Sequence, residues 1–126
     1  MIASAISISI GAIAGSLFRW YLGLSLNHLF PTIPLGTLTA NLIGGFLMGV
    51  FMGISKNYSF IPETPRLAIT TGFLGGLTTF STFSAETVSL LSYQEYFWSG
   101  LIIIGHVAGS IFATLFGIYT VKFLTF

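Results

Sequence analysis

Four long apolar runs decide what this chain can fold into. They cover residues 2–24, 35–54, 67–91 and 99–123. An α-helix rises 1.5 Å per residue, so about 20 residues cross the roughly 30 Å of hydrocarbon in a bilayer. Only four Lys/Arg and three Asp/Glu stand among 126 residues, too few to cover a water-facing surface. The sequence therefore predicts an all-α membrane protein with four transmembrane helices in a single domain over residues 1–126.

Charge and composition exclude several classes of function. The net charge of +1 gives no basic surface for nucleic acid. No cysteine is present, so disulfides and thiolate metal sites are excluded. Four spans place Lys56, Arg66 and Lys122 on one side of the membrane and Arg19 on the other. This positive-inside bias is small and permits insertion in both orientations, although charge alone slightly favours one topology with both termini cytoplasmic.

Glycine pairs four residues apart occur in every apolar run. The pairs are Gly11 and Gly15, Gly45 and Gly49, Gly49 and Gly53, Gly72 and Gly76, and Gly105 and Gly109. Small residues at this spacing let helix backbones approach closely within lipid. We expect tight packing throughout, and we expect an oligomer because four helices make a thin bundle with little room for an internal pathway.

The segment "GFLGGLTTFSTFSAET" at residues 72–87 is unusually polar for a lipid-spanning helix. Its glycines and the pair Thr78 and Thr79 are poor helix formers, so they predict a break in the third helix at mid-membrane. A broken backbone is tolerated at that depth only when it is buried in protein or lines a cavity. Freed carbonyls there can ligate a hard cation such as Na⁺, and freed amides and hydroxyls can hold an anion.

Phe80 and Phe83 follow the break on one helical face, with Ser81 and Ser84 on the neighbouring face. An aromatic ring carries a positive edge, so ring edges beside hydroxyls can line an anion path without a fixed charge. The alternative for two phenylalanines at this spacing is ordinary core packing.

Other polar residues inside the runs are candidate sites, because unpaired polar groups are costly in lipid. Arg19 is either a snorkelling anchor or a cation at a water-filled entrance. Asn41 lies on one face with Thr37, and the alternative to a pathway role is a hydrogen bond between helices. The stripe His106, Ser110 and Thr114 recurs every four residues and indicates a shared partner or pathway.

Three motifs in order resemble the fluoride channel family known as Fluc or CrcB. They are "GAIAGSLFRWYLG", "ANLIGGFLMG" and "GFLGGLTTFSTFSAE", and the resemblance covers the whole chain. It implies a passive, fluoride-selective channel that exports cytoplasmic fluoride across the bacterial inner membrane and lowers its toxicity. It also implies an antiparallel, dual-topology homodimer with two pores, whose partners are the fluoride ion, the lipid bilayer and a second copy of the chain.

The resemblance also implies roles for individual residues. Asn41, Phe80 and Phe83 fall on pore-lining positions, and Arg19 matches an entrance arginine. The remaining pathway positions are the hydroxyl segment Ser81, Thr82 and Ser84, the fourth-helix track His106, Ser110 and Thr114, and the acidic residue Glu86 at the far end. Many relatives have Tyr at the position of His106. The backbone carbonyls of Gly75 and Thr78 from both subunits are expected to hold a structural Na⁺ at the dimer centre.

Two other classes of function compete with a channel. A proton-coupled small-ion or drug carrier of the small four-helix type needs a carboxylate in its first helix, and residues 2–24 contain none. Glu86 is the one carboxylate near the interior of a span and leaves coupled exchange of fluoride and protons open. An intramembrane enzyme is not expected, because no G-x-S-x-G elbow accompanies His106 and Ser110.

Overall fold

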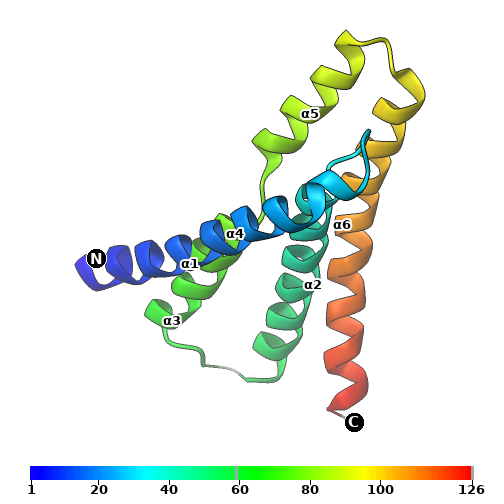
Figure 1. Ribbon diagram of the computed structural model, residues 1–126. Coiled ribbons are helices and arrows are strands. Elements are labelled where there is room, and N and C mark those ends of the chain that lie inside the picture. The colour runs from blue at the N-terminus through cyan, green and yellow to red at the C-terminus, as the bar shows by residue number, and fades with distance from the viewer. Residues whose placement is uncertain (59, 126) are drawn as a thin grey trace.

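The computed structural model describes residues 1–58 and 60–125, and these two ranges contain helices but no strand. The first two apolar runs form helix α1 (Ile2–Leu26), which ends in the short turn η1 (Asn27–Leu29), and helix α2 (Leu35–Asn57). The fourth run forms α6 (Tyr96–Leu124). Figure 1 shows α2 and α6 side by side, with α1 crossing their upper part.

The third apolar run is divided into consecutive helical pieces. They are α3 (Glu63–Leu67), the π-helical segment η2 (Ala68–Leu74), α4 (Gly75–Leu77) and α5 (Phe80–Ser92). Three helices in the described ranges are long and apolar enough to cross a membrane, and they correspond to the first, second and fourth predicted spans. The third run is not among them because each of its helical pieces is too short to cross a membrane alone.

Close backbone contact joins α1 to the first half of the third run. A Cβ atom on Gly76 would lie 2.6 Å from the carbonyl oxygen of Ala12, and one on Gly72 would lie 2.6 Å from that of Ile8. A Cβ atom on Gly11 or Gly15 would likewise collide with the backbone of this segment. The tight packing predicted from glycine spacing is confirmed here, and α4 lies along α1 in Figure 1.

Glycines also join α2 to α6, through the predicted glycines of α2 rather than through the predicted pair of α6. A Cβ atom on Gly45 would lie 2.8 Å from the carbonyl oxygen of Ser110, and Gly117 is closed by the backbone of α2. Gly105 and Gly109, in contrast, face only the side-chain ends of Leu38 and Leu42. At Gly105 and Gly109 the face of α6 is turned toward α2 side chains, so within one chain this pair makes no backbone contact in the described residues.

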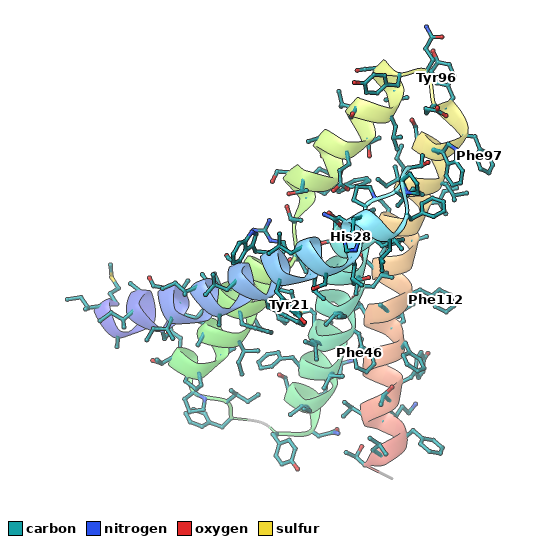
Figure 2. The ribbon with its side chains drawn as sticks, in the orientation of Figure 1. Tyr21, His28, Phe46, Tyr96, Phe97 and Phe112 are labelled. Atoms are coloured by element: carbon teal, nitrogen blue, oxygen red, sulfur yellow. The ribbon has the colours of Figure 1, made fainter. Side chains whose placement is uncertain are left out.

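Large apolar side chains cover the outside of the protein. Ile10 on α1 is 64% exposed and Phe112 on α6 is 76% exposed. Figure 2 shows Phe112 projecting away from the other helices. A chain with this surface and these helix lengths meets lipid, which leaves the polar residues on the inner faces to be explained.

Candidate functional site

The helical path of the third run is interrupted at Thr78 and Thr79. Both residues are extended, with φ and ψ of −84° and 152° at Thr78 and −148° and 117° at Thr79. The hydroxyl of Thr79 accepts a hydrogen bond of 3.2 Å from the backbone N–H of Thr82 and so caps the N-terminus of α5. The sequence therefore restarts a helix with a hydroxyl residue immediately after two extended positions.

Asn41 on α2 holds this interruption. Its Oδ1 accepts from the backbone N–H of Thr79 at 2.7 Å, and its Nδ2 donates to the carbonyl of Thr79 at 3.1 Å. The same Nδ2 lies 2.8 Å from Nδ1 of His106 on α6. Asn41 is buried, and these bonds connect three helices. The hydrogen bond between helices that the sequence left as an alternative is therefore what the structure shows.

The two phenylalanines of α5 have different surroundings. Phe83 is 7% exposed and stacks on His106, with ring centroids 4.6 Å apart and an angle of 28° between the planes. Phe80 is 76% exposed and meets Phe83 edge to face, with centroids 5.5 Å apart. Phe83 thus belongs to the core around Ile33 and Ile102, while Phe80 presents its ring at the surface.

An open pocket of about 480 Å³ brings most of the predicted site residues together. Six predicted pathway residues line it: Asn41, Phe80, Phe83, His106, Ser110 and Thr114. Gly75 and Thr78, the predicted Na⁺ ligands, line it as well. Its lining contains no Lys, Arg, Asp or Glu among the described residues, so its polar groups are hydroxyls, an amide, an imidazole and backbone. Such a wall can solvate an ion without a fixed opposite charge.

Arg19 lies in a second pocket of about 250 Å³, which Thr82 and Thr79 also line. Its Nε donates to the carbonyl oxygen of Gly76 at 2.9 Å. This contact holds the guanidinium against the end of α4. Thr79 lines both pockets, so the pocket of Arg19 and the pocket of Asn41 share this residue of the interruption.

Glu86 lies apart from these residues, in a third pocket of about 590 Å³ that Pro31 and Glu95 also line. Its Oε1 accepts a hydrogen bond of 2.6 Å from the hydroxyl of Thr37. Its Oε2 is buried and has no hydrogen-bond partner among residues 1–58 and 60–125. Thr37 and Asn41 lie one turn apart on α2, and both bond to the segment from Thr79 to Glu86, as their shared face predicted.

Two predicted residues lie outside these three pockets. Ser81 is exposed, with its Oγ 3.4 Å from Oγ1 of Thr79, and Ser84 is partly buried. Thr79 was missing from the predicted site although it has the most connections there. The signal for it was a hydroxyl residue three positions before Thr82 at a helix start.

Side-chain metal ligation has no basis in the described part of the chain. No group of three or more His, Cys, Asp or Glu side chains is gathered there. The carbonyl of Gly76 already accepts from Arg19, and the N–H of Thr79 is directed to Asn41 instead of to the carbonyl of Gly75. Any cation at this position would depend on backbone oxygens.

Comparison with known proteins finds a matching family model and relatives that are similar over nearly the whole chain. Residues 6–118 match the family model described as "CrcB-like protein, Camphor Resistance (CrcB)". A protein of Nitrosospira multiformis is 54% identical over 118 residues, which are 94% of this chain and 92% of the relative. One from Tolumonas auensis is 51% identical over 124 residues, or 98% of each chain, and one from Chromobacterium violaceum is 49% identical over 121 residues, or 96% of each. All three carry the name "Fluoride-specific ion channel FluC".

Proposed function

Since this chain belongs to the CrcB family, we propose that it is a fluoride-selective, passive ion channel that lets cytoplasmic fluoride leave the cell. The relatives at about half identity over nearly the whole chain are named as fluoride-specific channels. With its membrane-length helices, the chain is an integral, multi-pass protein of the bacterial inner membrane. The proposal gives it no enzymatic activity.

The observation that carries this proposal is the pocket around Asn41, Phe83 and His106. Fluoride is small and strongly hydrated, so it leaves water only where several donors and positive edges replace its hydration shell. Ser110 and Thr114 line this pocket together with an imidazole and the rings of α5. The Thr114 hydroxyl donates to the backbone carbonyls of Gly45 and Ser110, so the Ser110 hydroxyl and the imidazole are the side-chain donors considered for the anion. A neutral lining binds the anion weakly enough to release it, which suits conduction rather than storage.

Arg19 lines the second pocket with Thr79 and Thr82, which supports a role at the entrance of the pathway. A cation beside the hydroxyl of Thr82 raises the local concentration of anions without standing in the pathway itself. Because the guanidinium is anchored to the carbonyl of Gly76 through Nε, its remaining N–H groups keep a defined position.

An antiparallel homodimer is the second part of the proposal. The pocket is open at the side where Phe80 is 76% exposed, and a second copy would cover it. A two-fold arrangement would give two equivalent pathways, one facing each way, if the copies insert in opposite orientations. The chain has no native cysteine, so an Asn57→Cys variant carries a single label site at an exposed helix end. We expect an impermeant maleimide to reach half of the molecules from each side, and labelling from one side only would contradict dual topology.

A structural Na⁺ at the dimer centre is the third part. Gly75 is exposed, and the nearest atom to a Cβ placed there is the carbonyl oxygen of Thr70 at 3.8 Å. Its carbonyl and that of Thr78 are neutral oxygens of the kind a hard monovalent cation prefers, and two copies would supply about four. We expect Na⁺ to stabilise the dimer without crossing the membrane. Sodium flux equal to fluoride flux would contradict a static site.

The experiment that tests the function is fluoride efflux from liposomes that contain the purified protein. A K⁺ gradient with valinomycin sets the membrane potential, and 100 mV favours movement of one charge by roughly 2.3 kcal/mol, or about fiftyfold. We expect the potential alone to drive fluoride out, with chloride efflux near the rate of empty liposomes. Equal chloride flux would contradict selectivity.

The same liposomes test the competing carrier. Glu86, with one carboxylate oxygen buried and unpartnered among the described residues, is the feature that favours proton coupling. A pH-sensitive dye inside the liposomes measures proton movement during efflux. If protons move with fluoride at a fixed ratio, the protein is a coupled exchanger and the channel proposal fails.

A further inference from the structure

Asn41 makes every hydrogen bond that its amide hydrogens allow. Thr79 is extended, so its N–H and C=O point to the same side, as in a pair of antiparallel strands. A primary amide matches both groups in one orientation only, with Oδ1 on the N–H and Nδ2 on the C=O. The distances of 2.7 Å and 3.1 Å have this arrangement. The orientation of the amide is therefore set by the backbone of Thr79.

The remaining hydrogen of Asn41 goes to His106. An amide nitrogen carries two hydrogens, one of which meets Thr79, and Nδ1 of His106 lies 2.8 Å from the same nitrogen. Since Nδ2 can only donate, Nδ1 must accept and carries no proton. A neutral imidazole with an unprotonated Nδ1 has its proton on Nε2.

The Nε2 atom of His106 is a buried donor. His106 is 3% exposed, and Nε2 has no hydrogen-bond partner among residues 1–58 and 60–125. Stacking on Phe83 keeps the ring in place, and the residue lines the pocket of Asn41, Phe80 and Ser110. A buried N–H without a partner costs stability unless a ligand meets it.

We infer that Asn41 is a positioning residue with no hydrogen left for the anion, and that the Nε2–H group of His106 is the donor offered to the anion in its place. The identity of the anion in this inference rests on the proposed function. The assigned tautomer of His106 is independent of that function. Asn41 acts through His106: it keeps Nδ1 as an acceptor and so keeps the proton on Nε2.

Solid-state NMR of the protein in liposomes, labelled with ¹⁵N-histidine, tests the tautomer directly. The second histidine, His28, is exposed, and a His28→Gln variant removes its signals and assigns those of His106. At neutral pH we expect Nδ1 unprotonated, Nε2 protonated, and an Nε2 resonance that shifts with sodium fluoride but not with sodium chloride. A protonated Nδ1, or an Nε2 signal that ignores fluoride in a conducting protein, would overturn the inference.

The Asn41→Asp variant tests the positioning role. A carboxylate can only accept, so Nδ1 of His106 should become protonated in this variant. A structural role for Asn41 alone would leave Nδ1 unprotonated, and that result would overturn the inference. If wild-type protein carries no fluoride, the proposed function fails, whereas the tautomer measured without fluoride still decides the role of Asn41.

Flux through two variants of His106 tests the donor. His106→Phe keeps a ring on Phe83 but removes both nitrogens, and we expect at least about a tenfold loss of fluoride efflux, typical of a lost hydrogen bond to a charged group. His106→Gln keeps an N–H at the distance of Nε2 and should retain clearly more efflux than the Phe variant. The His28→Gln protein is the matched control. Equal losses in both His106 variants, or no loss in His106→Phe, would overturn the assignment.

Discussion

The two halves of the third apolar run are packed in opposite ways on either side of Thr78 and Thr79. The first half, through α4, contacts α1 backbone to backbone at glycines such as Gly72 and Gly76. The second half, α5, contacts α2 and α6 through side chains, and it contains no glycine. Figure 1 shows α4 lying along α1 and α5 running away from it.

This difference gives the first half a packing role and leaves the second half to the proposed ion pathway. Backbone contact leaves no room for a ligand, and each glycine in it excludes larger side chains. Side-chain contact lets polar and aromatic groups reach a shared pocket, and it leaves Phe80 uncovered in a single chain. Asn41 stands between the halves because it bonds to Thr79, so it should be the most sensitive position.

Asn41→Asp is expected to have the largest effect on transport. The carboxylate would face the carbonyl of Thr79 and add a negative charge to an anion pathway. We expect fluoride efflux to fall by at least about a hundredfold, a barrier increase of roughly 2.7 kcal/mol. Liposome efflux measures it, and size-exclusion chromatography checks assembly.

The control for this change is Asn57→Asp, the same substitution at the exposed end of the same helix. It should conduct like wild type. Wild-type efflux in an assembled Asn41→Asp protein would show that Asn41 and its contact with Thr79 are not part of the pathway.

Isoleucine at Phe80 or Phe83 is expected to have a smaller effect. An aliphatic side chain removes the positive ring edge with little change in volume, so we expect efflux to fall by at least about tenfold, or roughly 1.4 kcal/mol. Methionine should be tolerated better because its side chain is flexible and polarizable. The same liposome assay measures each variant.

Phe112→Ile is the control, because Phe112 has the same exposed fraction as Phe80, 76%, on the outer face of α6. It should leave efflux unchanged. If Phe80→Ile and Phe83→Ile also leave it unchanged, α5 is packed like any other helix and the contrast between the halves loses its functional meaning.

Gly76→Ala tests the anchoring half. The added methyl would meet the carbonyl oxygen of Ala12, and overpacking of this kind costs about 1–3 kcal/mol. The free energy of unfolding in detergent measures the loss. Gly100→Ala on α6 is the control, since in the described part of the chain no atom beyond its own helix turn lies within 4 Å of a Cβ there, and it should cause no loss. Equal free energies of unfolding for the two variants would mean that the close contact between α1 and α4 does not contribute to stability.

Thr79→Ala should have the smallest effect. The variant loses the side-chain cap of α5, typically about 1 kcal/mol, but keeps both backbone bonds to Asn41. Thr78→Ala is the control, because that hydroxyl only bonds back to Leu74 within its own segment. Thermal unfolding in detergent compares the two. A Thr78→Ala protein that is less stable than Thr79→Ala would contradict the capping role.

Hydropathy predicted most of the fold because it depends on local composition alone. The helices α1, α2 and α6 were expected, with ends that differ by a few residues: α1 continues to Leu26 and α6 begins at Tyr96. The polar segment after Gly72 was also visible, since glycine and threonine disfavour a helix wherever they stand. Glycine spacing was a weaker guide, because Gly105 and Gly109 have the same spacing as true backbone contacts but face side chains.

The sequence by itself determined which residue types stand in the apolar runs: an amide, an imidazole, hydroxyls, aromatic rings, one guanidinium and one carboxylate. Only the tertiary structure decided how they are paired. It directed Asn41 to Thr79 and His106, Thr37 to Glu86, and Arg19 to the carbonyl of Gly76. These partners lie 49 to 65 residues apart along the chain, except that Asn41 and Thr79 are separated by 38. Periodicity gives the face of one helix, whereas pairing depends on how helices cross and rotate against each other, and that is set by where glycines let their backbones meet.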